Sequence, residues 1–245
     1  MNDYTRPSSA IAAGRADMAV DAGLRAFMLG VFNKMALGLL LSGAIATFVA
    51  TNEVAARFFF SSPMIWVVMF GPMALLLISS FVMRNPSPLA ASAIYWTVVS
   101  FFGVSIGGIV MVYAAQPNGL TDVAKAFFIT AASFGALSLW GYTTKRDLTG
   151  FGSFLIMGLV GLVLASIVNM FLHSGPLGFA ITLIGVFVFA GLTAFDTQRL
   201  KYQYYALQGD NRSLAVATSY GALSLYLDFV NLFLMILRLL GSSRN

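Results

Sequence analysis

The stretch FAITLIGVFVFAGLTAFDTQRL, residues 179–200, decides the fold class of this chain. It is apolar along nearly its whole length, and its first charged residue is Asp196. An α-helix needs roughly 20 apolar residues to cross the hydrocarbon core of a bilayer. A second stretch of the same kind contains GALSLYLDFVNLF, residues 221–233, with Asp228 inside it. The two stretches therefore predict membrane-spanning helices that each carry one carboxyl group.

The composition of the whole chain agrees with this interpretation. Of its 245 residues, 59% are hydrophobic and 9% are charged, and the mean hydropathy is +0.85. A soluble domain is typically about 25% charged. The apolar runs are continuous and do not alternate in segments of about ten residues, as the strands of a membrane β-barrel would. The sequence therefore predicts an all-α, polytopic membrane protein.

Seven apolar runs are long enough to span, and turn-forming or charged residues separate them. They cover about residues 27–50, 64–83, 89–115, 123–142, 150–172, 179–200 and 219–240. We expect a polar N-terminal tail (1–24), one seven-helix transmembrane domain (25–241) and a short C-terminal tail (242–245). Within the tail, an interfacial helix is expected at about 16–25. The last span is expected near the centre of the bundle because both its faces are apolar.

Lys and Arg indicate how these spans are oriented. If the N-terminus is cytoplasmic, most basic residues fall on the cytoplasmic side, and only four lie outside: Arg57, Lys125, Arg238 and Arg244. Cytoplasmic loops of membrane proteins carry an excess of Lys and Arg. Seven spans then place the C-terminus on the opposite side. The net charge of +5 is spread over these loops, so we expect a lipid bilayer and no nucleic acid as partner.

Small residues recur within the spans, for example at Gly103 and Gly107, and at Gly158 and Gly161. Such spacing is typical of helices that pack closely in membranes. The alternative interpretation is that these glycines act as hinges in a gate.

The residues of an enzyme site are missing from the spans. The chain has no Cys, and its single His, His173, falls in a predicted external loop. No buried base stands ready to activate a serine, and no Gly-rich phosphate loop is present. We therefore expect no enzyme activity, no catalytic residue, no cofactor and no resident metal ion.

The two aspartates are the strongest functional candidates. Asp196 lies about two turns before the end of its helix, and Asp228 lies nine residues into the next. At 1.5 Å per residue, both lie roughly 12–14 Å from the cytoplasmic boundary. Two carboxyl groups at one depth on neighbouring helices can share a proton and titrate as a unit. Ionisable groups inside a membrane are functional by default, although Ser, Tyr or Asn neighbours could also satisfy each aspartate structurally.

Three further side chains could act with this pair. Arg84 closes the second span on the cytoplasmic side, where it could extend to lipid headgroups or reach inward to Asp196. Arg199, three residues after Asp196, is a local competitor for that carboxylate. Asn231, three residues after Asp228, could hydrogen-bond it. Lys34 in the first span is expected to extend toward headgroups.

These residues match a known pattern. ALSLYLDFVNLF, residues 222–233, resembles the signature of the Bax inhibitor-1 family in its bacterial branch. The segment FDTQ (195–198) resembles the aspartate-bearing end of that family's sixth helix, and KRDL (145–148) resembles its fourth-to-fifth loop. The resemblance covers about residues 25–241.

The resemblance implies a pH-sensitive calcium leak in the bacterial inner membrane. In that picture Asp196 and Asp228 form the proton sensor, Arg84 is the latch on the sixth-helix aspartate, and Ca²⁺ is the permeant ion. Some relatives carry a further acidic residue in the second helix, and residues 70–76 here contain none. Other bacterial relatives are linked to inhibition of a membrane-bound AAA protease, so a regulatory interaction protein is the alternative.

Overall fold

The computed structural model describes residues 9–82 and 86–242, with side chains described for 22–77 and 86–241. The described residues form helices and loops and contain no β-strand. The helices are α1 (Ser9–Thr51), α2 (Glu53–Phe60), α3 (Met64–Val82), α4 (Pro88–Ala114), α5 (Gly119–Thr143), α6 (Thr149–Leu172), α7 (Gly175–Ala206) and α8 (Asn211–Ser242). The all-α, polytopic class predicted from the sequence is confirmed.

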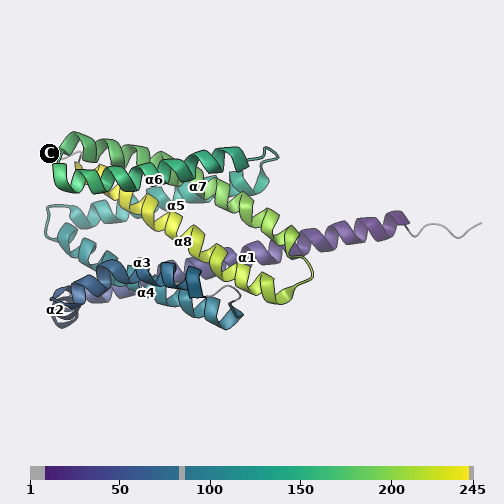
Figure 1. The fold of residues 1–245 in the computed structure, drawn as a ribbon, viewed down its shortest axis with the longest axis horizontal. Coiled ribbons are helices and arrows are strands. Elements are labelled where there is room, and N and C mark those ends of the chain that lie inside the picture. The colour runs from purple at the N-terminus through teal and green to yellow at the C-terminus, as the bar shows by residue number, and fades with distance from the viewer. Residues whose placement is uncertain (1–8, 83–85, 243–245) are drawn as a thin grey trace, which may run out of the picture.

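Helix α8 forms the centre of the bundle. It packs against α1, α4, α5 and α7, and Figure 1 shows it running between the group α1–α4 and the group α5–α7. Its side chains Leu225, Tyr226 and Leu232 are almost completely buried. The prediction that the last span is central is therefore confirmed. Helix α1 begins at one end of the bundle and α8 ends at the other (Figure 1).

The second span is broken rather than straight. Six helices are long and apolar enough to cross a membrane, and a bent pair brings the number to seven if it counts as one span. In this pair, the segments Glu53–Phe60 and Met64–Leu77 meet at 71°. The Asn52 side chain caps α2 by accepting a hydrogen bond of 3.0 Å from the Ala55 amide. This capped helix α2 precedes the run that the sequence predicted as the whole span.

Helices α3 and α6 lie at the edges of the bundle. In the described part of the chain, α3 packs only against α2 and α4, and α6 packs only against α7. Both helices expose large apolar side chains, as expected for surfaces in contact with lipid. The two helices do not meet, so the bundle is open between them.

Helix α1 begins earlier than the sequence suggested. It runs unbroken from Ser9 to Thr51, so residues 16–25 continue directly into the first span. Figure 1 shows α1 projecting beyond the ends of the other helices. The ammonium group of Lys34 turns into the bundle, where it donates to Ser92 Oγ and, over 2.8 Å, to Ser219 Oγ. The expectation that Lys34 extends toward headgroups is therefore wrong.

The glycine pairs differ in their surroundings. A Cβ atom added at Gly103 or Gly107 would lie only 2.9–3.0 Å from side-chain atoms of Ile45 or Val49 on α1. Close packing is therefore confirmed for α1 and α4. Gly161 on α6 has no such neighbour within 4 Å, so close packing does not explain that glycine.

Two aspartates outside the spans accept hydrogen bonds at the starts of helices. Asp210 accepts hydrogen bonds from Ser213 and Arg212 before α8, and Asp147 accepts two from Thr149 at the start of α6. The Ser213 and Thr149 side-chain hydroxyls lower the pKa of Asp210 and of Asp147, respectively. A lowered carboxyl pKa stabilises the folded state above the unfolded pKa of about 4, and this stability is lost only as the pH falls through the folded value. A response to pH near neutrality must come from other groups.

Candidate functional site

Asp196 lies on α7 with 5% of its surface exposed. Its Oδ1 atom forms an ion pair of 3.2 Å with Nη1 of Arg199, one helical turn away. Its Oδ2 atom accepts a hydrogen bond from the hydroxyl of Ser224 on α8. Arg199 also donates to Ser224 Oγ over 3.2 Å. Each of these three side chains contacts the other two. Both carboxyl oxygens of Asp196 therefore have a partner, one on its own helix and one on α8.

Asp228, on α8, lines the same cavity as Asp196, and 6% of its surface is exposed. Its carboxyl group interacts directly with that of Asp196. Its Oδ2 atom is buried and has no hydrogen-bond partner. The Asn231 side-chain amide donates instead to the carbonyl of Leu227, over 2.8 Å. The expected hydrogen bond between Asn231 and Asp228 is therefore not formed, and Asp228 keeps an unpaired acceptor atom.

The structure does not describe Arg84, so the predicted latch lies outside the described residues. Among those described, the cation that holds Asp196 is Arg199. Its guanidinium also lies over the Phe195 ring, 5.8 Å from the centroid. The ion pair that the spacing of Arg199 and Asp196 predicts is formed, and its competition with Arg84 stays a prediction.

The aspartates line a cavity of about 820 Å³, which we call the aspartate cavity. Helices α3, α4, α6, α7 and α8 form its walls. Asp196, Asp228 and Arg199 are its only charged lining residues among those described. No group of three His, Cys, Asp or Glu that could hold a metal ion occurs in the described part of the chain.

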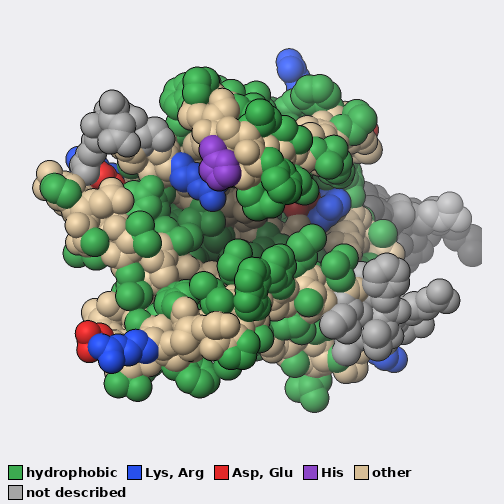
Figure 2. Space-filling view, turned by 60° about the vertical axis from the view of Figure 1, so that its left-hand side comes forward, with side chains coloured by type: hydrophobic (Ala, Val, Ile, Leu, Met, Phe, Trp, Pro, Cys, Tyr) green, Lys and Arg blue, Asp and Glu red, His purple; other side chains and the backbone are tan. Residues whose placement is uncertain are grey.

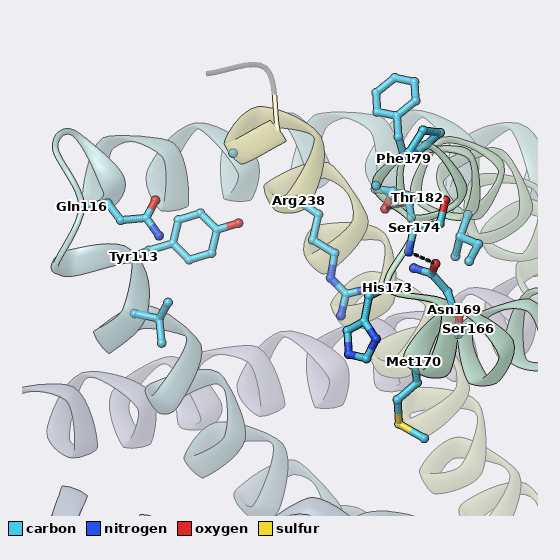
Figure 3. Close-up of a pocket in the computed structure, with 16 residues that line it drawn as sticks. Tyr113, Gln116, Ser166, Asn169, Met170, His173, Ser174, Phe179, Thr182 and Arg238 are labelled. Carbon is cyan, nitrogen blue, oxygen red and sulfur yellow. Dashed lines mark hydrogen bonds between the residues drawn. The ribbon is translucent and has the colours of Figure 1, made fainter. Parts of the chain in front are cut away.

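A larger cavity of about 1170 Å³ opens at the end of the bundle that holds the C-terminus, and we call it the outer hollow. Figure 3 shows Tyr113 and Gln116 on one side, Asn169 and Ser174 on the other, and Arg238 reaching between them from α8. In Figure 2 a deep hollow separates the two halves of the bundle, with the single His and basic side chains at its rim. Two lining residues, Ser166 and Met170, are shared with the aspartate cavity, so the two cavities adjoin.

A third cavity, of about 440 Å³, lies on the other side of Arg199, and we call it the inner hollow. Its lining includes Leu200, Gln203 and Tyr220 near the opposite end of the bundle. Arg199 lines both this hollow and the aspartate cavity. Arg199 is thus the lining residue that the aspartate cavity and the inner hollow have in common.

Gln198 supports the site, and the sequence analysis missed it. Its side chain is buried, with 1% exposed. Its Oε1 accepts a hydrogen bond of 2.8 Å from the Leu148 amide, and its Nε2 donates over 2.7 Å to the carbonyl of Arg146. These bonds tie the loop between α5 and α6 to α7, two residues after Asp196. An amide inside a membrane-length run needs partners, and that was the available signal.

The fold and this site define a polytopic helical membrane protein with a buried carboxyl pair. The sequence model of the family described as inhibitor of apoptosis-promoting Bax1 matches residues 24–245. The chain belongs to this family, the Bax inhibitor-1 family. The family resemblance seen in the sequence is confirmed.

Individual relatives cover nearly the whole chain. A protein of Caulobacter vibrioides, named only as uncharacterised, is 53% identical over the full length of both chains. The inner membrane protein YbhL of Escherichia coli K12 is 40% identical over 91% of this chain and 94% of its own. An uncharacterised protein of Rickettsia prowazekii is 39% identical over the full length of both.

Proposed function

We propose that this protein is a proton-controlled cation leak, with Ca²⁺ as the permeant ion and Asp196 and Asp228 as the proton sensor. The observation that carries this proposal is the unpaired Oδ2 atom of Asp228. It belongs to an acidic pair that lines a cavity adjoining the outer hollow. A carboxylate kept without a partner inside a membrane protein is costly, and this cost favours a functional role.

The chemistry of the site suits transient passage of a hard cation. Ca²⁺ prefers oxygen ligands but takes six to eight of them in a tight site. Two carboxyl groups, with the hydroxyl of Ser224 and the amide of Asn231 nearby, offer fewer. An ion that enters such a site is bound weakly and can leave, as conduction requires. Ca²⁺ is therefore a transported ion here and not a resident cofactor.

Control would come from Arg199. While Asp196 is ionised, it holds the guanidinium across the junction between the aspartate cavity and the inner hollow. Protonation of the carboxyl pair removes the negative partner, and Arg199 is then free to turn toward solvent, where its side chain is already 48% exposed. The leak is expected to open as the pH falls. Arg84, on the predicted cytoplasmic side, remains a candidate second latch.

Replacing Asp228 with asparagine tests the proposal directly. In liposomes that contain the purified protein and a Ca²⁺ dye, flux through the wild type should rise as the pH falls from 8 to 5. The Asp228→Asn variant should lose this dependence because its amide cannot take up the proton. At pH 8, where the carboxyl pair of the wild type is ionised, we expect roughly a tenfold difference in flux between the variant and the wild type. This corresponds to about 1.4 kcal/mol in the barrier.

The control for this experiment is Asp210→Asn, which removes a carboxyl group from a loop outside the spans. This variant should keep the pH profile of the wild type, since Asp210 caps α8 and lines neither the aspartate cavity nor the inner hollow. An Asp228→Asn protein that is folded and has an unchanged profile would overturn the proposed sensor.

We propose a location in the bacterial inner membrane, with the N-terminus in the cytoplasm and the C-terminus in the periplasm. Two observations support this: the name of the Escherichia coli relative, and the concentration of Lys and Arg at the N-terminal end of the bundle. A C-terminal alkaline phosphatase fusion should be active, and the same fusion after α7 should be inactive. Activity in the reverse pattern would invert the orientation.

Restraint of a membrane-bound AAA protease is a second candidate function. It is favoured by α1, whose first turns project beyond the bundle where another protein could reach them (Figure 1). Deletion of residues 2–24 should then release the protease in cells while flux in liposomes stays unchanged. Protease control that survives this deletion would count against the tail as the regulatory element.

A further inference from the structure

The aspartate cavity opens sideways toward lipid. Several side chains that line it are also largely exposed on the apolar surface of the bundle. They are Met73 at 62% on α3, and Val163 at 51% and Met170 at 63% on α6. Since α3 and α6 do not pack against each other, this opening lies between two spans. The floor of the cavity, by contrast, carries the buried carboxyl pair.

The charges on that floor are unequal. Asp196 and Asp228 oppose a single cation, Arg199, and no other charged residue lines the cavity in the described part of the chain. With both carboxyl groups ionised, one negative charge is left without a partner. The group left without a cation is the carboxylate of Asp228, whose Oδ2 atom is buried and has no hydrogen-bond partner. One ammonium group would balance this charge and supply the missing hydrogen bond.

We infer that the aspartate cavity binds a lipophilic amine that enters from the bilayer between α3 and α6. The ammonium group donates to Asp228, and the apolar tail lies along the walls formed by α3 and α6. Charge complementarity at the floor and an apolar opening at the rim each select this class of ligand. A neutral amphiphile lacks the ammonium, and an anionic one meets two carboxylates.

The size of the cavity fits such a ligand. Cavities of about 300–1,000 Å³ bind small organic molecules, and this one measures about 820 Å³. Its lining on α6 runs from Ile156 to Met170, which is about 21 Å of helix. Within this length, each added methylene should strengthen apparent binding from water about three- to fourfold. Partition into lipid gives the same gain, so the ammonium group, and not the tail, must make the cavity preferable to the surrounding bilayer.

The binding itself is independent of any ion flux, whereas its effect on flux rests on the proposed leak. An amine on Asp228 would occupy the cation route and should block it. The two ideas can therefore fail separately. Loss of flux control with intact binding would overturn only the leak, and flux without binding would overturn only the amine site.

The experiment uses decylamine with a photoreactive diazirine at the end of its chain, added to the full-length protein in nanodiscs. Mass spectrometry of the labelled peptides then locates the tail. We expect saturable labelling of α3 and α6 at the rim of the cavity, reduced by unlabelled decylamine and not by decanol. Asp228→Asn should weaken labelling about tenfold, because its amide carries no charge.

A second pair of variants keeps the test independent of Asp228. Val163→Trp fills the opening on α6 and should reduce labelling severalfold. Leu164→Trp is the matched control. Leu164 is 58% exposed on the same helix, close to the 51% of Val163, but lies outside the cavity lining, so labelling should be unchanged. Equal labelling by the amine and by an alcohol probe, or equal labelling of the two tryptophan variants, would overturn the inference.

Discussion

Replacing Arg199 with glutamine is expected to raise the resting Ca²⁺ flux at neutral pH by about tenfold, a change of about 1.4 kcal/mol in the barrier. Arg199 lines both the aspartate cavity and the inner hollow, so in the proposed leak its positive charge would oppose a cation passing from one to the other. Glutamine keeps much of the length of the side chain and removes the charge. Liposome flux at pH 7.5 is the measurement.

The control is Arg212→Gln, which also removes one positive charge. Arg212 is exposed in the first turn of α8 and lines neither the aspartate cavity nor the inner hollow. The Ca²⁺ flux through the Arg212→Gln variant should equal that through the wild type. If Arg199→Gln and Arg212→Gln gave the same flux, the barrier would lie elsewhere.

A double-mutant cycle resolves how Arg199 is held. Asp196→Asn should also raise resting flux, because it removes the carboxylate that pairs with Arg199 at 3.2 Å. Combining it with Arg199→Gln should add little, since both changes remove one interaction. Independent effects that add in free energy would show that the two residues act separately.

The second large effect is expected at Gly141, where the backbone of α7 lies close to α5. A Cβ atom at this position would lie 2.3 Å from the backbone oxygen of Ala194, two residues before Asp196. Backbone cannot move aside as a flexible side chain can. Gly141→Ala should therefore destabilise the protein by about 1–3 kcal/mol, and a thermal melt in detergent should show Tm lower by several degrees.

Gly135→Ala on the same helix is the matched control. A Cβ atom there meets nothing within 4 Å, so the substitution adds a methyl group in open space. Its Tm should be equal to that of the wild type or slightly higher, because alanine is favoured over glycine in helices. Equal Tm values for the two variants would show that α5 and α7 separate without cost.

The spans were predictable because membrane-length apolar runs leave few alternatives. Residues 150–172 and 179–200 correspond closely to α6 and to the greater part of α7. The bend between α2 and α3 was not predicted, because α2 is short and its sequence, EVAARFFF, reads as an amphipathic turn before the span. Length and apolarity identify a span, but they do not show how the chain enters it.

The candidate site was predictable in part for a related reason. Equal depth on antiparallel neighbours was enough to predict that Asp196 and Asp228 lie together, and the structure brings them into direct interaction. Sequence spacing cannot show which face of a helix meets which neighbour. Lys34 was therefore placed toward headgroups, although it binds Ser92 and Ser219 inside the bundle. The role of the pair as a proton sensor stays a prediction.

The separation of α3 from α6 has one more consequence. If the protein is a leak, acyl chains and not protein would complete the insulation around the ion route between these two helices, which do not pack together in the described part of the chain. The electrical resistance of the closed state would then depend on how tightly those acyl chains pack. The composition of the membrane would then set the baseline of the proposed leak. The same protein should therefore show different resting conductances in fluid and in rigid bilayers.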